Sequence, residues 1–274
     1  MTTRFATGRI RVPLKPGAPR LKAILRSDYQ LPSIPGRVNY LASIEDWSVL
    51  GNDRAGNCET VRAFNDEHVV TLKLGQPVAY PPDMSLVWEL YKTQNPGFDP
   101  NGSSDTNGPG SSHDNGMQTQ LLLEYLREHG MPGSGRKVAG WATVNLTDEA
   151  EVDAALAIFG RLWLDVVVCG AQQTQFANGQ PWDYDPTSPQ EGGHAILGGG
   201  YAPEADESMD AETWAAVVKL TDSFREKQCE QALVVVWEDE LDSPAFLEGV
   251  DAAAAREAFA HLTGGTFPGT PDAA

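Results

Sequence analysis

The order of its secondary-structure patterns most constrains how this chain can fold. Before about residue 145, apolar residues recur at helical spacing, first after residue 58 and again within 117–130. After that point come short runs rich in Val, Leu and aromatic residues, which are typical of strands and span 162–170, 194–201, 214–220 and 232–237. Helices followed by strands predict an α+β protein with a helical lobe, a β-rich lobe and a cleft between them.

Other segments fill in this outline. A third helix is expected from Thr147 to about Phe159, with acidic residues in its first turn where the helix dipole favours them. The segment 95–116 consists almost entirely of turn formers and is predicted to be a long loop. The acidic stretch 202–213 is expected as a surface loop, and 251–262 as a terminal helix.

The patterns also suggest a domain organisation. Residues 1–50 contain several prolines and a basic cluster with little periodicity, so we expect an extended N-terminal arm that wraps the body. Residues 51–262 form one domain, with a helical lobe at about 51–145 and a β-rich lobe at about 146–250. The remaining residues, 263–274, are expected to be a frayed C-terminal tail.

The charge balance narrows the range of partners. Twenty Lys and Arg against 38 Asp and Glu give 20 − 38 = −18, which repels phosphate backbones and anionic lipids. We therefore expect no nucleic-acid partner and no membrane partner. No apolar run approaches the roughly 20 residues that span a bilayer, and no secretory signal is visible. A cytoplasmic or virion location is expected.

Three cysteines, Cys58, Cys169 and Cys229, are too few and odd in number to indicate a disulfide framework. Neither Cys169 nor Cys229 has metal-ligand spacing to a histidine. The Asp- and Asn-rich segment 99–115 lacks the closing Glu of an EF-hand loop and is better explained as a mobile loop. No cofactor and no metal are expected.

Cys58 has the surroundings that a nucleophilic cysteine needs. The segment 51–58, GNDRAGNC, is a Gly- and Asn-rich turn that leads into the first helix. A helix N-terminus stabilises a thiolate through its unpaired N–H groups and its dipole. The alternative is a buried structural thiol, because free cysteines are often buried.

At this point the sequence resembles the papain and cathepsin cysteine peptidases. Asn52 lies six residues before Cys58, and Gly56-Asn57-Cys58 matches the family's Gly-small-Cys ending. The segment 114–132 resembles the family's Gly-containing turn and following helix. A later stretch has the family's order of small apolar strand, Phe, Gly, His-Ala-apolar and Gly-Tyr, at Phe176, Gly179, His194-Ala195-Ile196 and Gly200-Tyr201. The separation 194 − 58 = 136 falls within the family's range of about 130–150.

The resemblance implies a papain-like two-lobed fold, in which the Cys helix packs on an antiparallel sheet or barrel lobe that carries the His. It also implies roles: Cys58 as nucleophile, His194 as base, and Asn52 as an oxyanion donor together with the Cys58 N–H. Asp222, in Asp222-Ser223-Phe224, occupies the place of the family's ring-orienting Asn. A turn residue at a strand end is the alternative for Asp222, and an Asx turn is the alternative for Asn52.

Some features depart from the family. Glu59 follows the nucleophile where an aromatic residue is usual, and there is no stretch long enough for a typical inhibitory propeptide. The GND-x-x-GNC opening and the QPWD…EGGH stretch also resemble papain-like proteins of actinobacterial phages and their hosts. Two functions follow: a cysteine peptidase or amidase that acts on a peptide or protein substrate, or a catalytically silent papain-like scaffold that serves as a phage virion structural or decoration protein bound to neighbouring subunits.

Overall fold

The computed structural model describes residues 4–14, 17–30, 39–200 and 209–263 of the 274-residue chain. Tyr201, most of the acidic stretch 202–213 and almost all of the expected tail lie outside these residues. The helices are α1 (Leu21–Ile24), η1 (Leu41–Ser43), α2 (Cys58–Lys73), α3 (Met84–Lys92), α4 (Thr119–Glu128), α5 (Glu149–Phe159), α6 (Gly170–Ala177), α7 (Asp222–Gln228), η2 (Glu238–Glu240), α8 (Pro244–Gly249) and α9 (Ala252–Thr263). The strands are β1 (Val138–Thr143), β2 (Arg161–Cys169), β3 (Gln190–Gly199), β4 (Met209–Thr213), β5 (Ala216–Leu220) and β6 (Cys229–Trp237).

The strands form one six-stranded sheet in the order β1-β6-β2-β3-β4-β5, and every neighbouring pair is antiparallel. β2 lies inside the sheet between β6 and β3, and all nine of its residues are buried. Its side chains alternate between the two faces: Leu162 and Leu164 join one apolar core, while Trp163 joins the other. The sheet therefore has a hydrophobic core on each face.

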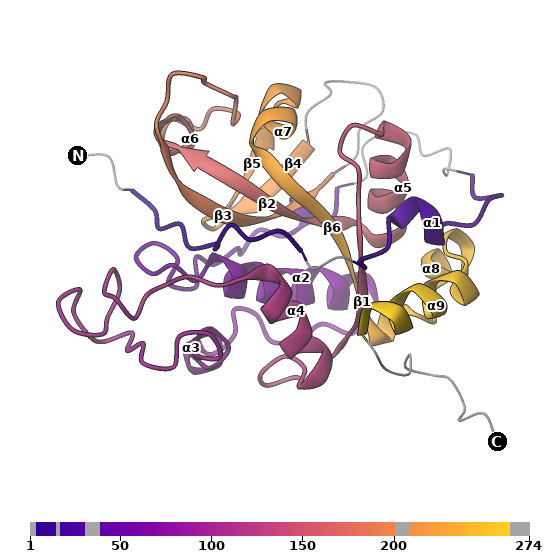
Figure 1. Cartoon of the computed structure of the whole chain (residues 1–274), viewed down its shortest axis with the longest axis horizontal. Coiled ribbons are helices and arrows are strands. Elements are labelled where there is room, and N and C mark those ends of the chain that lie inside the picture. Colours follow the sequence, from indigo (N-terminus) through magenta and orange to yellow (C-terminus); the bar gives the residue numbers. More distant parts are fainter. Residues whose placement is uncertain (1–3, 15–16, 31–38, 201–208, 264–274) are drawn as a thin grey trace.

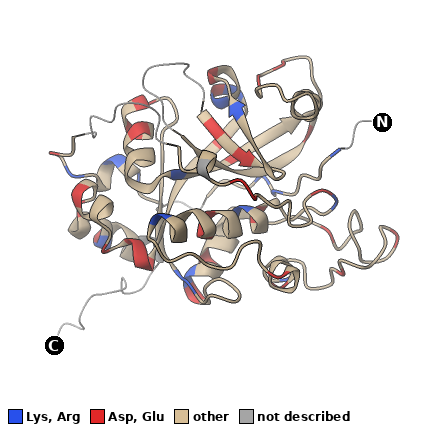
Figure 2. Ribbon diagram, turned by 180° about the vertical axis from the view of Figure 1, so that it is seen from behind, with Lys and Arg blue, Asp and Glu red and all other residues tan. Residues whose placement is uncertain are grey.

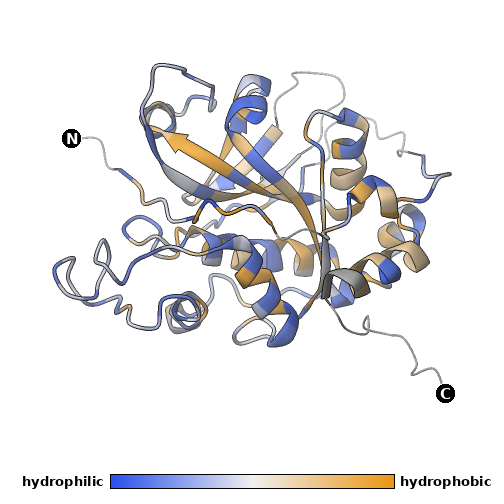
Figure 3. Ribbon diagram, in the orientation of Figure 1, coloured by the Kyte–Doolittle hydropathy of each residue, from blue (hydrophilic) through white to orange (hydrophobic). Residues whose placement is uncertain are grey.

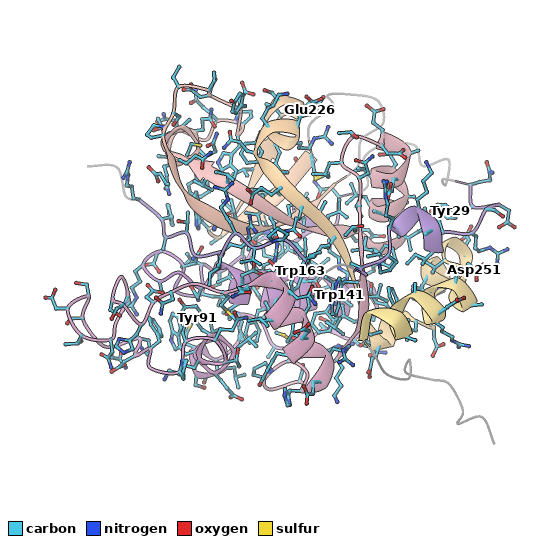
Figure 4. The ribbon with its side chains drawn as sticks, in the orientation of Figure 1. Tyr29, Tyr91, Trp141, Trp163, Glu226 and Asp251 are labelled. Atoms are coloured by element: carbon cyan, nitrogen blue, oxygen red, sulfur yellow. The ribbon has the colours of Figure 1, made fainter. Side chains whose placement is uncertain are left out.

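Helices cover both faces of this sheet (Figure 1). On one face, α2, α3 and α4 form the helical layer, and α2 packs directly against β3. Trp141 and Trp163 fill the space between this layer and the sheet (Figure 4). On the other face, α1, α5, α7, α8 and α9 bury their apolar residues against the second core. This arrangement confirms the predicted α+β fold, with a helical lobe that carries the Cys helix and an antiparallel sheet that carries His194.

Helix α2 and strand β2 are joined by buried ion pairs but differ in composition. Much of α2 is hydrophilic, whereas β2 is strongly hydrophobic (Figure 3). Every residue from Cys58 to Thr71 is nevertheless buried. Buried charged groups need partners, so the polar side chains of α2 must be paired inside the protein.

The structure departs from the expected elements around β1, β4 and β5. β1 lies within the segment that was assigned to the helical lobe, because it pairs with β6 at the edge of the sheet. The expected strand 214–220 is instead a turn followed by β5, and residues 209–213 of the expected acidic loop form β4. The segment 95–116 contains neither a helix nor a strand, as predicted.

The first described part of the N-terminal arm, residues 4–14, passes between the two layers (Figure 1). Arg9 N donates to Gly193 O of β3 at 2.9 Å, and Ile10 N donates to Met117 O at 2.8 Å. Met117 N donates to Gly8 O at 2.8 Å. The arm is therefore hydrogen-bonded to the sheet on one side and to the segment before α4 on the other.

The excess of acidic residues is spread over helices, strands and loops, with Lys and Arg between them (Figure 2). Within the part of the chain that the structure describes, no helix has the length and apolar character required to cross a bilayer.

Candidate active site

Cys58 is the first residue of α2 and is 1% exposed. The turn before it is held from both sides: Asn57 Nδ2 donates to Leu50 O at 2.9 Å, and Gly56 N donates to Asp114 Oδ1 at 2.9 Å. The helix then begins with Val61 N donating to Asn57 O. The sequence pattern thus places the sulfur at the helix N-terminus, as predicted.

Burial nevertheless raises the pKa of the Cys58 thiol to about 12. The neighbouring Glu59 carboxylate adds to the increase in pKa. The N–H groups of Ala195 and Gly8 and the charge of Arg62 oppose it, but they are outweighed. In this conformation the thiol stays protonated at neutral pH.

His194 lies in β3 and is also 1% exposed. Its Nε2 is 2.8 Å from Thr213 Oγ1, and the ring of Trp214 lies 4.8 Å from its ring centroid. The other nitrogen, Nδ1, is buried and makes no hydrogen bond with any described residue. Burial lowers the pKa of His194 to about 3, and the charges of Arg62 and Arg9 contribute. The ring is held at one nitrogen and is neutral.

The Cys58 thiol lies next to the strand segment that carries His194. The N–H of Ala195, the residue after His194, interacts with the Cys58 thiol. No hydrogen bond joins the Cys58 Sγ to the His194 ring within the described part of the chain. The contact that joins the two segments is therefore made by the Ala195 backbone, and neither Cys58 nor His194 is charged in this conformation.

Thr213 and Trp214 are site residues that the sequence analysis missed. They end β4 and enter the turn to β5, where Trp214 has φ 48° and Ala215 has φ 64°. Two successive positive φ values are the conformation of a tight hairpin turn, although neither residue is a glycine. The apolar run from Trp214 onward concealed this turn, since there was no Gly or Asn to mark it.

Asp222 does not hold the His194 ring in the structure. It is the first residue of α7 rather than the end of a strand, because Thr221 caps that helix by accepting from Phe224 N. Its carboxylate forms an ion pair with Arg225. The His194 ring bonds through Nε2 to Thr213 instead.

Asn52 is 2% exposed and lies in the turn before Cys58. Its Nδ2 donates to Ala55 O at 2.9 Å, so the amide closes the turn in this conformation. Its backbone oxygen accepts from Ala6 N of the arm at 3.1 Å. Asn52 therefore connects the arm to the nucleophile turn, and one of its two amide hydrogens is used within that turn.

The arm covers the thiol. Gly8 lies so close to the nucleophile turn that a Cβ atom on it would be 1.9 Å from Gly56 O. Gly193, beside His194, is also restricted, because a Cβ there would be 2.4 Å from Arg9 O. Trp214 Nε1 donates to Ala6 O at 3.3 Å, and Phe5 stacks on the Trp214 ring at 5.0 Å. Only glycine at position 8 allows the backbone to approach this closely.

Beneath the thiol lies a buried charge group, here called the Arg62 cluster. Arg62 binds Glu59 through one nitrogen and Asp165 Oδ1 through the other, the latter at 2.7 Å. Thr119 Oγ1 donates to Glu59 Oε1 at 2.7 Å. Burial raises the pKa of Glu59, while Arg62 opposes the increase. Glu59 thus points into a polar core, which explains how it replaces the aromatic residue that the family resemblance predicts.

The described residues contain no group of three or more His, Cys, Asp or Glu side chains arranged to hold a metal ion. The reactive groups at the site are the Cys58 thiol, the His194 imidazole and the backbone N–H groups around them.

Comparison with solved structures identifies proteins of similar fold. No protein-family model matches the sequence, and no curated protein matches it. Xylellain, a cysteine protease from Xylella fastidiosa, aligns over 86% of this chain and 97% of its own, with a TM-score of 0.61 and 12% identity.

Two cathepsin structures are also similar. Procathepsin B S9 from Trypanosoma congolense covers 85% of this chain and 87% of its own, with a TM-score of 0.57 and 10% identity. Digestive procathepsin L 3 from the larval midgut of Tenebrio molitor covers 80% and 76%, with a TM-score of 0.50 and 12% identity. At identities this low, the structural similarity establishes a shared fold and no more. The fold of this chain is that of the papain-like cysteine proteases.

Proposed function

We propose that this chain is a papain-like cysteine hydrolase that cleaves peptide or amide bonds, and that its own arm occupies the substrate groove in the described conformation. The observation that carries the proposal is the state of His194. Thr213 orients one ring nitrogen, and the other is buried beside the Cys58 segment without a hydrogen-bond partner among the described residues. A general base needs one nitrogen oriented and the other available.

In the proposed reaction, His194 Nδ1 takes the proton of the Cys58 thiol, and the thiolate attacks the carbonyl carbon of the substrate. The Cys58 N–H stabilises the developing oxyanion. His194 then returns the proton to the leaving amine, and water releases the acyl group from the sulfur. Asn52 stays in the proposal as a second oxyanion donor, through the amide hydrogen that does not bond to Ala55 O.

The electrostatics support an inhibited resting state. A thiol with a pKa of about 12 and an imidazole with a pKa of about 3 cannot form a thiolate–imidazolium pair at neutral pH. Burial is the first cause of both shifts, and the arm contributes to the burial of both groups. Departure of the arm admits water, removes the Arg9 charge and moves both pKa values toward each other.

A steric variant tests the proposal in the full chain. Gly8→Ala places a methyl group against Gly56 O and should displace the arm. We expect this variant to hydrolyse a mixture of fluorogenic peptides, and the same variant with Cys58→Ala to be inactive. Arg4→Ala, at an exposed arm position, serves as the matched control and should resemble the wild type. Activity that persists without Cys58, or a Gly8→Ala variant no more active than its Cys58→Ala derivative, contradicts the proposal.

A second candidate is the silent scaffold, which the same burial favours because the described conformation has a protonated, covered thiol. In this case the chain is a virion structural or decoration protein, related to the papain-like proteins of actinobacterial phages, and the body contacts neighbouring subunits in the virion or the infected cytoplasm. A displaced arm would then leave Cys58 unreactive.

A further inference from the structure

Arg9 is buried in the body although it belongs to the arm. Its side chain is 0% exposed, and Nη1 lies 3.4 Å from Asp165 Oδ2. Its Nη2 donates to Glu230 Oε2. By contrast, Arg11, two residues later, is 45% exposed and binds the other oxygen of Glu230. The arm thus inserts one guanidinium group into a pocket and leaves the next at the surface.

The body does not balance the charge of this pocket by itself. Glu59, Asp165 and Glu230 contribute three carboxyl groups, while Arg62 is the guanidinium that the body places among them. Even with Glu59 protonated, two carboxylates face one cation. Glu230, whose side chain is 30% exposed, is the carboxylate that Arg62 does not pair with, and Arg9 of the arm supplies the second cation.

The pocket also lies at a fixed position relative to the thiol. Gly8 sits against the Cys58 turn, and Arg9 is the next residue. The backbone of this pair is held by Gly193 O and Met117 N, which are groups that any extended peptide can use. A peptide that replaces the arm in this groove presents a side chain to the same carboxylates.

We propose that the pocket filled by Arg9, formed by Asp165 and Glu230, is a specificity pocket for an arginine side chain of a peptide substrate. This inference rests on the proposed function and defines its substrate class, with the arm as the resident competitor. Arginine fits better than lysine, because two separate guanidinium nitrogens contact two carboxylates and a single ammonium cannot match that fork.

The test measures binding and cleavage separately. The full-length Gly8→Ala protein is titrated with a fluorescent peptide that copies residues 4–12, and with a copy that carries uncharged citrulline in place of Arg9. We expect the arginine peptide to bind about 10- to 100-fold more tightly. Citrulline in place of Arg11 should have a much smaller effect, because Arg11 is half-exposed.

Two variants keep the test decisive. Arg9→Ala empties the same pocket without a steric clash and provides a second protein for the same titration. Glu230→Gln, at a position that is 30% exposed, should reduce the preference for arginine over citrulline in either background. Equal affinities for the two peptides overturn the specificity pocket even if both are cleaved. Selective binding without cleavage supports the pocket and overturns the proposed hydrolase.

Discussion

Two buried arginines, Arg62 and Arg161, connect α2 to β2 at different points along the helix. In the Arg62 cluster, α2 supplies the guanidinium and β2 supplies Asp165. In the second group, here called the Arg161 cluster, the roles are reversed: β2 supplies Arg161, and α2 supplies Asp66. Helix α2 and strand β2 are therefore joined by two ion pairs of opposite direction, with the guanidinium on the helix in one and on the strand in the other.

The two clusters differ in completeness. Arg161 also binds Glu240 through two nitrogens, each at 2.8 Å, and Trp237 Nε1 donates to Asp66 Oδ2 at 2.7 Å. All of these groups belong to the body. The Arg62 cluster is contacted by Arg9 of the arm through Asp165, and both Arg9 Nε and Arg62 Nε are buried without a described hydrogen-bond partner. The comparison indicates that the Arg161 cluster stabilises the fold, whereas the Arg62 cluster fixes the arm over the thiol.

The largest expected effect is the loss of the Arg161 cluster. Arg161→Met leaves Asp66 and Glu240 buried without their cation and should lower the free energy of unfolding by about 3–5 kcal/mol. Urea unfolding followed by circular dichroism measures this change. The matched control, Arg256→Met at an exposed position of α9, should change the stability by less than about 0.5 kcal/mol. Equal effects would show that the cluster does not stabilise the fold.

Glu212 is a buried carboxyl group that bonds to an amide instead of a guanidinium. Asn65 Nδ2, on α2, donates to its Oε2 at 2.6 Å, and burial raises the pKa of Glu212 from 4.5 to about 7. Between these pH values the folded protein holds a proton that the unfolded chain releases. The stability that Glu212 contributes is therefore greatest below pH 4.5 and is lost as the pH rises through about 7.

Glu212→Gln replaces the ionisable carboxyl group with an amide and retains an oxygen that can accept from Asn65 Nδ2. We expect it to stabilise the protein by about 3 kcal/mol at pH 8 and to have little effect near pH 4. Unfolding in urea at the two pH values measures the difference. A stability gain that does not depend on pH would contradict the assigned pKa.

Arg9→Ala should be milder than Arg161→Met. Asp165 keeps Arg62 and Thr119 as partners, and water can reach the pocket once the arm loosens. We expect a loss of about 1–2 kcal/mol in unfolding free energy, together with faster proteolysis of the arm. Arg11→Ala is the control, since it binds the same Glu230 from the surface. If Arg9→Ala costs as much as Arg161→Met, the two clusters have the same structural role.

The smallest expected effect comes from Thr213→Val, which keeps the shape of the side chain and removes the hydroxyl at His194 Nε2. We expect a loss of about 1 kcal/mol in stability. In the Gly8→Ala background it should lower the turnover number and leave KM nearly unchanged, because Thr213 orients the ring and does not contact the substrate. An unchanged pH profile and turnover number would exclude this positioning role.

The sequence predicted the parts of the site that depend on local pattern. A Gly- and Asn-rich turn before an amphipathic stretch placed Cys58 at a helix N-terminus, and a β run after Gly-Gly placed His194 in a strand. The partners of these residues were not predictable in the same way. Thr213 reaches His194 through a hairpin turn that lacks glycine, and Arg9 reaches Asp165 from 156 residues away. Contacts set by tertiary packing leave no periodic signal.

The most direct test of the account is the alkylation rate of Cys58 by iodoacetamide at pH 7, with the modified residue identified by mass spectrometry. With the arm in place, a buried thiol with a pKa of about 12 should react much more slowly than a free cysteine peptide. Gly8→Ala should accelerate the reaction beyond the rate of the peptide, and His194→Ala in that background should abolish the acceleration. Rapid labelling of Cys58 in the wild type, or a Gly8→Ala variant as slow as the wild type, would contradict the account.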